Sequence, residues 1–371
     1  MIVGSISLRG IKMRQHMLLL AILLVLVIPR APSLAQSSVD QGLLLDWHPS
    51  GTMIAYAIHG SNQVVIVDIS SSPNVVLNTY LTSDVLFDPP QWSPDGQMLA
   101  ITDSPTSIAV WSNAWDATLA SREYHLDVIN ELGYSNIPGI SNYVWHPSGT
   151  QIALSIGTSV ATWNLLSDQY QNLPFNEYIS QITDLKWFDE DTILLGDTSP
   201  RAALVDVVTG EIETSLYLSA AVTLEAVSAV SPSPDRSRVA FGSTLGLLEI
   251  WDPSQGTFYE GFGLLSYESE RSTFGSETRM SWVEWNPTGE YIAMADQDGL
   301  IRVWEAETLE LVQEYNGLPN GSVAWSPDGM QLAFSTAENG LVIVDGPPIT
   351  SVNQMPSADA GVDQTVNDSD N

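Results

Sequence analysis

The sequence predicts an all-β protein, a seven-bladed β-propeller of four-stranded antiparallel blades, on three observations. A tight turn recurs seven times along the 371 residues. Each turn lies between two apolar segments of strand length, and a third such segment completes each repeat. Successive turns begin 40 to 53 residues apart, and a repeat of about 40–45 residues is typical of propeller blades.

The turn itself predicts a hairpin at the start of every repeat. In Trp92-Ser93-Pro94-Asp95-Gly96, the proline fixes φ for the second position of a type I turn, and the glycine takes the last position without steric cost. The seven turns are residues 47–51, 92–96, 145–149, 187–190, 232–235, 285–289 and 325–329. The fourth lacks the Pro-Gly pair and the fifth lacks the glycine, so blades four and five depart most from the pattern.

Aromatic residues mark equivalent positions in the repeats. We expect the third strands to end at Val67-Asp68, Trp111-Ser112, Trp163-Asn164, Val205-Asp206, Trp251-Asp252, Trp304-Glu305 and Val344-Asp345. The tryptophans with a structural place in the repeat are Trp47, Trp92, Trp145, Trp187, Trp285 and Trp325 at the first strands, and Trp111, Trp163, Trp251 and Trp304 at the third. Packing between blades is the role we predict for them.

These strand endings resemble the WD40-repeat family, most clearly in Leu248-Glu249-Ile250-Trp251-Asp252 and Ile301-Arg302-Val303-Trp304-Glu305. The turns followed by Leu-Ala are also similar to the repeats of TolB-like (PD40-like) exported bacterial propellers. The resemblance covers residues 43–345 and implies a propeller. No repeat carries the Gly-His pair of the WD40 pattern, so the buried Asp-His-Ser/Thr-Trp network of that family is not expected.

The N-terminus has the composition of a secretory signal peptide. Arg9, Lys12 and Arg14 precede the apolar run 17–28, and the small-residue site Ser33-Leu34-Ala35 follows. The run has 12 residues, whereas a membrane-spanning helix needs about 20. We therefore expect cleavage between Ala35 and Gln36, a secreted or cell-surface protein, and no membrane span after cleavage.

Charge and composition exclude several classes of function. Residues 1–35 contain four of the 12 basic residues and none of the 44 acidic ones, so residues 36–371 carry a net charge of −36. Such a field repels nucleic acid and anionic lipid. The chain has no cysteine, so disulfides and thiolate chemistry are excluded, and it contains no nucleotide, metalloprotease or hydrolase motif. We expect no cofactor and no metal, and a monomer in solution.

The two longest spacings predict insertions on the face that carries the connections between blades, at residues 121–143 and 264–281. Loops of this kind commonly carry specificity, and aromatic residues mixed with arginine are typical of binding surfaces. The binding residues we predict there are Arg122, Tyr124, Tyr134, Asn136, Tyr267, Arg271 and Arg279.

The C-terminal residues 347–371 lie outside the repeats and give the domain boundaries 1–35, 36–346 and 347–371. Because only residues 36–41 separate the expected cleavage site from the first strand, we expect residues 349–353 to supply the outer strand of blade seven and close the ring. The tail from Pro356 to Val366 resembles the first strand of polycystic-kidney-disease-type immunoglobulin-like domains, which implies the front portion of a longer extracellular protein or a truncated reading frame. An acidic linker is the alternative.

Two functions remain open. In the first, the protein is an exported, noncatalytic scaffold whose loops bind a protein, a peptide or a cell-surface polymer. In the second, it is an enzyme or a small-molecule-binding propeller with a site in the central channel. The second requires polar groups of shifted pKa that converge in the channel, and the expected inner strands offer Asp46, Asp184 and Glu284 as scattered acids.

Overall fold

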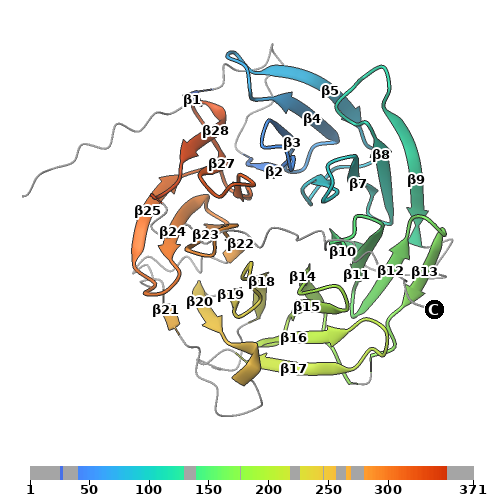
Figure 1. Cartoon of the computed structure of the whole chain (residues 1–371), viewed down its shortest axis with the longest axis vertical. Helices are drawn as coiled ribbons and strands as arrows, with labels where there is room; N and C mark the ends of the chain where they lie inside the picture. Colours follow the sequence, from blue (N-terminus) through green and yellow to red (C-terminus); the bar gives the residue numbers. More distant parts are fainter. Residues whose placement is uncertain are drawn as a thin grey trace, which may run out of the picture.

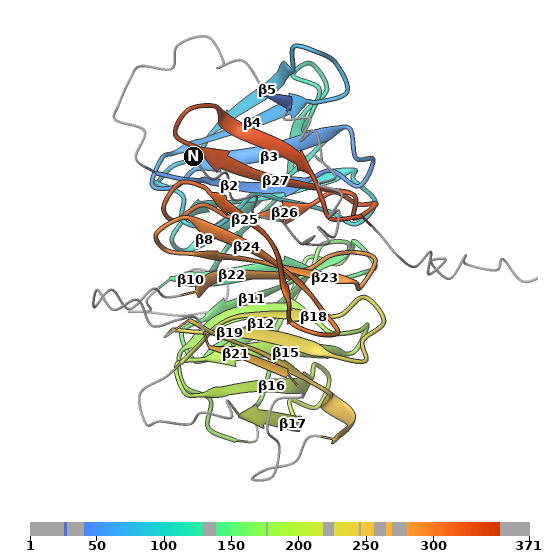
Figure 2. The ribbon, with the colours of Figure 1, turned by 90° about the vertical axis from the view of Figure 1, so that its left-hand side faces the viewer.

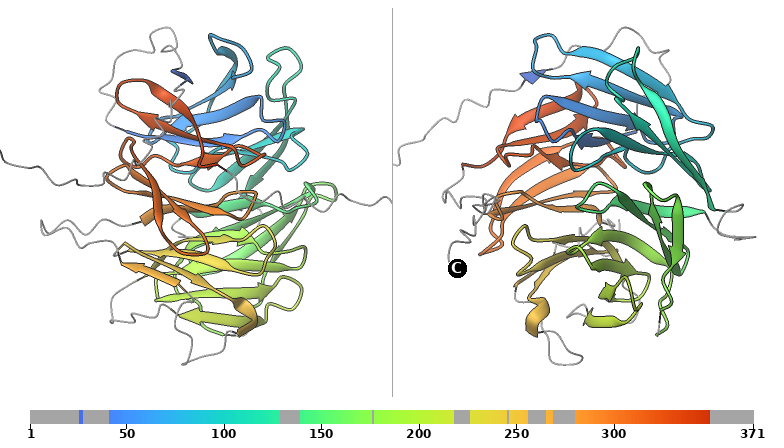
Figure 3. Two further views of the ribbon diagram at one scale, coloured as in Figure 1. Left: turned by 60° about the vertical axis from the view of Figure 1, so that its left-hand side comes forward. Right: turned by 45° about the vertical axis from the view of Figure 1, so that its right-hand side comes forward.

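Seven four-stranded antiparallel sheets form a ring in the computed structural model, which confirms the predicted fold class (Figure 1). The structure describes residues 26–27, 41–128, 139–175, 177–217, 226–244, 246–255, 265–268 and 280–348. Viewed from the side, the strands cross the thickness of a disc, and the blades follow one another around it (Figures 2 and 3). No helix in these ranges is long and apolar enough to cross a membrane.

The strands of blades one to six follow one another in the chain from the innermost to the outermost. Blade one contains β2 (Leu43–Trp47), β3 (Met53–Ile58), β4 (Gln63–Asp68) and β5 (Val75–Leu81), and blade two contains β6 (Gln91–Trp92), β7 (Met98–Ser104), β8 (Ser107–Ser112) and β9 (Ser121–Asp127). Blade three contains β10 (Ile140–Trp145), β11 (Gln151–Ile156), β12 (Ser159–Asn164) and β13 (Gln169–Asn172), and blade four contains β14 (Ile182–Trp187), β15 (Thr192–Asp197), β16 (Arg201–Asp206) and β17 (Ile212–Tyr217).

The remaining blades keep the same order with one exception. Blade five contains β18 (Val227–Pro232), β19 (Val239–Ser243), β20 (Leu247–Trp251) and β21 (Leu265–Glu268), with the 3₁₀ turn η1 (Pro253–Gln255) after β20. Blade six contains β22 (Met280–Trp285), β23 (Tyr291–Asp296), β24 (Leu300–Glu305) and β25 (Leu311–Asn316). Blade seven combines β26 (Ala324–Trp325), β27 (Gln331–Thr336) and β28 (Gly340–Asp345) with β1 (Leu26–Val27), which comes from the other end of the chain.

The seven first-to-second strand turns lie where the sequence placed them, and the two degenerate ones show how the missing residues are replaced. The turn glycines adopt positive φ, as at Gly96 (φ 71°). In blade five Arg236 takes that conformation instead, with φ 62°. In blade four the Asp189 carboxylate accepts the main-chain N–H groups of Asp191 and Thr192 and so fixes the turn without a glycine.

The two predicted insertions are partly wrong, because each contains the outermost strand of its blade. Ser121–Asp127 is β9 and pairs with β8, and Leu265–Glu268 is β21 and pairs with β20. Only three strands per repeat were recognised in the sequence, since outer strands are exposed on one side and lack a continuous apolar pattern. Residues 129–138 and 269–279, the rest of these segments, lie outside the described part of the chain.

Ring closure also differs from the expectation. Leu26–Val27 pairs with β28 as the outer strand of blade seven, with Leu26 opposite Ile343 and Val27 opposite Val342. Both residues lie in the expected signal peptide, and Val27 is a strand former as well as apolar, so an apolar run of this composition can also pair as a strand. Residues 349–353, which we expected in that place, lie outside the described residues.

The junction between blades seven and one is also held at the inner strands. The main-chain N–H of Leu45 donates to Ser322 Oγ at 2.9 Å, and that of Ser322 donates to the Leu43 carbonyl at 2.9 Å. The Leu43 N–H donates to Ser335 Oγ at 2.9 Å. The ring is therefore closed by hydrogen bonds close to the axis as well as by the outer strand.

The apolar core lies between adjacent blades. Residues of blades two and three share one buried cluster that contains Ile108, Leu126, Trp145 and Trp163, and blades five and six share another around Trp285 and Trp304. Trp163 and Trp304 are almost completely buried, in keeping with the packing role predicted for the repeat tryptophans. This close packing leaves the inner strands to line a channel along the axis.

Candidate functional site

The inner strands place two rings of side chains in the central channel, because alternate residues of a strand face the same side. The residue directly before each repeat tryptophan, or before Pro232 in blade five, belongs to the turn-side ring. This ring consists of Asp46, Gln91, Val144, Lys186, Ser231, Glu284 and Ala324, and all seven line a cavity of about 340 Å³. The sequence singles out this set through its fixed position relative to the turn.

A second ring is formed by the residues two or three positions before the turn-side residues, in or just before each inner strand, toward the face with the connections between blades. This mouth-side ring consists of Leu44, Pro89, Asn142, Asp184, Ser228, Trp282 and Ser322, and it lines an adjoining cavity of about 400 Å³. Asp88, His59 and Phe87 also line this cavity. Pro89, Gln91 and Trp282 line both cavities, so the two form one continuous channel.

Lys186 brings the only lysine ammonium group that the described residues supply, since the sequence has just one other lysine, Lys12, which lies outside them. Its Nζ lies 3.5 Å from Asp184 Oδ1 and 5.2 Å from the centre of the Trp282 ring. A carboxylate on one side and an aromatic face on the other are both attractive to a cation. The channel thus contains a formed ammonium-binding position.

Three further carboxyl groups in the channel have raised pKa values, although each side chain keeps partial exposure to the channel. Removal from bulk water raises the pKa of Asp46 to about 7, against the opposing effect of a hydrogen bond from Trp92. The same loss of hydration, with repulsion from Asp184, raises the pKa of Asp88 to about 7. It raises the pKa of Glu284 to about 8, with repulsion from Asp46 adding to it.

The acids that looked scattered in the sequence are therefore brought together in one channel. Asp46, Asp184 and Glu284 belong to the two rings, and Lys186 lies among them. Sequence reasoning missed Asp88, which precedes Pro89 in the segment that joins blades one and two. Its position cannot be read from strand periodicity, because it depends on the path of that connection.

Three of these acids also hold neighbouring blades together. Three turn-side side chains accept the main-chain N–H of the next repeat tryptophan: Asp46 from Trp92 at 2.8 Å, Ser231 from Trp285 at 3.0 Å, and Glu284 from Trp325. Three other junctions use the indole, which donates to the main-chain carbonyl of the turn-side residue: Trp47 to Ala324 at 3.1 Å, Trp145 to Gln91 at 3.0 Å, and Trp187 to Val144 at 3.3 Å. Between blades four and five, where Pro232 replaces the tryptophan, the Val230 N–H donates to Asp184 Oδ2 at 2.8 Å. Among the described residues, the indole nitrogens of Trp92, Trp285 and Trp325 have no hydrogen-bond partner.

The predicted binding residues divide into three groups. Arg122 and Tyr124 lie on the outer strand β9, where Arg122 is exposed and Tyr124 packs edge-on against Trp163 with ring centres 6.3 Å apart. The main chain of Tyr267 pairs with Leu248 in blade five. Tyr134, Asn136, Arg271 and Arg279 lie outside the described residues.

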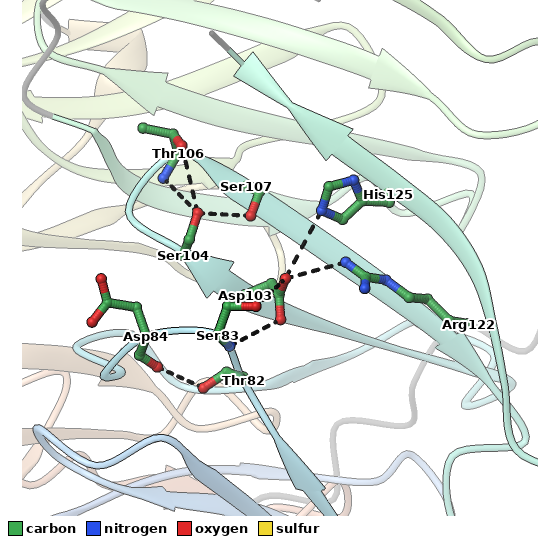
Figure 4. Close-up of polar contacts among 9 residues, drawn as sticks. All are labelled: Thr82, Ser83, Asp84, Asp103, Ser104, Thr106, Ser107, Arg122 and His125. Atoms are coloured by element: carbon green, nitrogen blue, oxygen red, sulfur yellow. Dashed lines mark hydrogen bonds and ion pairs between the residues drawn. The ribbon is translucent and has the colours of Figure 1, made fainter. Parts of the chain in front are cut away.

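Arg122 belongs to a polar cluster at the junction of blades one and two (Figure 4). Its Nη2 lies 3.2 Å from Asp103 Oδ2, and His125 Nε2 lies 3.9 Å from the same oxygen. Ser83 Oγ donates to Asp103 Oδ2 at 3.2 Å. Asp103 therefore connects the outer strand of blade two to the segment that leaves blade one.

That connecting segment presents apolar side chains to solvent on a fixed backbone. Val85 and Phe87 are 43% and 60% exposed, whereas Leu86 between them is 2% exposed, and Leu81 at the end of β5 is 73% exposed. The segment is held from both sides: Leu86 N–H donates to the Ser61 carbonyl at 2.6 Å, and Ser83 N–H to the Asp103 carbonyl at 3.0 Å. We call Leu81, Val85, Phe87, Arg122 and His125 the crossover surface.

Comparisons with known proteins agree with this architecture. Residues 268–305 match the family described as WD domain, G-beta repeat, and this stretch reaches the end of β24 in blade six. The human WD repeat and HMG-box DNA-binding protein 1 is 33% identical over 75 residues, which are 19% of this chain and 7% of that protein. The protein transport protein sec13 of Emericella nidulans is 31% identical over 125 residues, which are 30% of this chain and 38% of that protein.

The chain thus spans well under half the length of either curated relative, and the likeness concerns the repeat rather than a whole protein. The matched repeat ends at Glu305, in the segment whose sequence resembles WD40 most clearly. Seven four-stranded blades surround the channel. On these grounds the protein is a WD40-repeat-like seven-bladed β-propeller.

Proposed function

We propose that this protein is an exported, noncatalytic scaffold that binds a protein partner through the crossover surface. The observation that carries the proposal is the pair of exposed side chains Val85 and Phe87 on a backbone fixed by hydrogen bonds to both adjacent blades. A rigid apolar projection loses little conformational entropy on binding, so most of its buried area contributes to affinity.

The composition of the surface supports the same function. Aromatic and arginine side chains are the residues that most often dominate binding energy, and Phe87 and Arg122 supply one of each. Arg122 and His125 lie against Asp103, which also binds Ser83 of the connecting segment, and they supply polar groups of the kind that form the rim of protein interfaces. Because the chain is strongly acidic, the partner we propose is a protein with a neutral or basic contact face, and nucleic acid is disfavoured.

Export is part of the proposal. The leader 1–35 supports secretion with cleavage between Ala35 and Gln36, and the absence of cysteine is compatible with an oxidising compartment. Expression of the whole sequence in a bacterial host, followed by N-terminal sequencing of the exported product, tests this part. A product that begins at Gln36 supports it, and retention of the uncleaved chain in the cytoplasm contradicts it.

Binding is tested with a surface variant and a matched control. Val85→Ser/Phe87→Ser removes the apolar projection, and Leu166→Ser changes a residue that is 76% exposed in blade three. Proteins captured from the envelope and medium of the source organism are identified, and their affinities for the three forms are measured with purified partner. We expect the double variant to bind at least tenfold more weakly and Leu166→Ser to bind like the wild type. Equal binding by all three contradicts the assignment of the surface.

A second candidate function, binding of a small molecule in the central channel, is favoured by a separate observation. The carboxyl groups of raised pKa converge there with Lys186. A binding site in the channel requires such convergent polar groups of shifted pKa. Among the described residues no group of His, Cys, Asp and Glu could hold a metal ion. This candidate therefore concerns an organic ligand.

A further inference from the structure

We propose that the central channel binds a small aliphatic amine with two or more ammonium groups. The proposal rests on the two adjoining cavities of about 340 and 400 Å³ and on the polar side chains that both rings direct into them. Of the crossover surface, Leu81, Val85, Arg122 and His125 line neither cavity, whereas Phe87 lines the mouth-side one.

The ammonium group of Lys186 shows which contacts the channel offers to a cation. Lys186 Nζ lies between the carboxylate of Asp184 at 3.5 Å and the face of Trp282 at 5.2 Å. These are the two kinds of contact by which proteins commonly hold alkylammonium groups. A free amine of the same chemistry would find equivalent partners at the other carboxyl groups of the channel.

The acidic side chains of the channel outnumber its basic ones. Four acids, Asp46, Asp88, Asp184 and Glu284, face a single lysine. No hydrogen bond satisfies the Asp88 carboxyl within the described ranges, and its neighbours are another acid and the lysine already paired with that acid. Added positive charge therefore stabilises the channel.

The arrangement of the acids favours a ligand with two cationic ends. Asp46 and Glu284 belong to the turn-side ring, whereas Asp88 lines the mouth-side cavity. Two residues of β-strand advance by about 7 Å, so the two levels are separated by about the distance between the nitrogens of an extended four-carbon diamine. A divalent metal ion needs several oxygens at about 2–2.6 Å, and the described residues offer no such group.

Amine binding is expected to release protons, which gives the proposal a signature of its own. The titratable groups in and around the channel are Asp46, Asp88, Tyr143, Asp184, Lys186 and Glu284, with His59 at the mouth. Near pH 7 the carboxyls of Asp46 and Asp88, with pKa values of about 7, are partly protonated, and Glu284, with a pKa of about 8, is mostly so. A bound cation favours their ionised forms, so affinity rises as pH increases from 6 to 8.

The structural role of the same acids can be separated from their charge. Asp46 and Glu284 accept main-chain hydrogen bonds from Trp92 and Trp325. Asp46→Asn and Glu284→Gln keep an oxygen that can accept those bonds and remove only the charge. The matched control is Glu211→Gln/Glu213→Gln, which removes two exposed carboxylates at the outer strand of blade four.

Calorimetric titration of the purified protein with putrescine, at pH 6 and pH 8, is the test, and 1,4-butanediol serves as the neutral ligand of the same shape. We expect putrescine to bind at least threefold more tightly at pH 8, the diol not to bind, and Asp46→Asn/Glu284→Gln to weaken putrescine at least tenfold. The control variant should stay within twofold of the wild type. Equal binding of the diol, or an equal loss in both double variants, overturns the proposal.

A second variant tests the ammonium position itself. Lys186→Ala leaves Asp184 and Trp282 without their cation, so butylamine should raise the thermal unfolding midpoint of this variant more than that of the wild type. Butanol should not reproduce the effect, and an equal shift with butanol contradicts the proposal. Leu81→Ser/Val85→Ser alters the crossover surface at two residues that line neither cavity, and it should bind putrescine like the wild type, so loss of protein docking and loss of amine binding are distinguishable.

Discussion

His48 and Gly96 connect the turns of blades one and two: the imidazole Nε2 of His48 lies 3.0 Å from the carbonyl oxygen of Gly96. On the other side of the ring, Nδ1 accepts the main-chain N–H of Ser50 at 3.1 Å. These bonds require the neutral tautomer with the proton on Nε2. The imidazole also packs edge-on against Trp92, with ring centres 4.8 Å apart, so the turn of one blade covers the core of the next.

This contact predicts that alanine lowers the free energy of unfolding by different amounts at two equivalent turn glycines. Gly51 and Gly96 both have φ of 71°, so alanine at either position is strained by about 1 kcal/mol. A Cβ at Gly51 meets no atom closer than 3.9 Å, whereas one at Gly96 would lie 2.7 Å from Cε1 of His48. We expect Gly96→Ala to destabilise the protein by about 2 kcal/mol more than Gly51→Ala in urea unfolding. Equal losses would show that the imidazole moves aside without cost.

The same histidine predicts a loss of stability in acid. Burial lowers the pKa of His48 below its ordinary value of 6.5. The unfolded chain therefore binds a proton more readily than the folded one, and this contribution to stability is complete above pH 6.5 and decreases as pH falls below it. His48→Gln should flatten the pH dependence of the unfolding free energy between pH 5 and 7. An unchanged slope in this variant would assign the acid sensitivity to other groups.

The channel acids predict that the protein also loses stability as pH rises above neutral. The folded-state pKa of Glu284 is raised from 4.5 to about 8, so the folded protein holds a proton that the unfolded chain has released. Stability from this group is complete below about pH 4.5 and is lost as pH rises through 8. A pKa difference of one corresponds to about 1.4 kcal/mol, so Glu284→Gln should be more stable than the wild type by about 1 kcal/mol or more at pH 9. Unfolding curves at pH 5 and pH 9 check this, and the gain must be absent at pH 5.

Arg236 predicts a stabilising substitution in the fifth turn. It adopts φ 62°, a conformation that costs an L-residue about 1 kcal/mol and a glycine almost nothing. The fifth turn otherwise resembles the others, since Ser233 Oγ donates to Asp235 Oδ1 at 2.7 Å. We expect Arg236→Gly to raise the unfolding free energy by about 0.5–1 kcal/mol. Arg238→Gly, two residues later, is the control and should destabilise.

Much of the fold could be predicted because it repeats. The turn at Gly96 and its six equivalents specify the first two strands of each blade by local chemistry, and the ends of the third strands follow from aromatic or aliphatic residues such as Trp251. The outer strands could not be recognised in the same way. β13, for example, is entirely exposed, so its sequence carries no apolar alternation.

The candidate site was predictable only in part, for a different reason. Asp46 and Glu284 occupy the same position before the turn, so periodicity places both in the channel. That Lys186 lies between Asp184 and Trp282 depends on the curvature of the ring, which brings blades four and six together across the axis. Phe87 and Asp88 belong to a connection with no periodicity, and their positions follow from hydrogen bonds to neighbouring blades.

The hydrogen bonds between β2 and blade seven also bear on the proposed removal of residues 1–35. Leu45, Ser322 and Leu43 join the first and last blades without a contact from those residues. Under the proposed export, cleavage after Ala35 removes, among the described contacts, the two-residue pairing of β1 with β28. The closure at the inner strands then remains, so the proposal does not require cleavage to precede folding or to follow it.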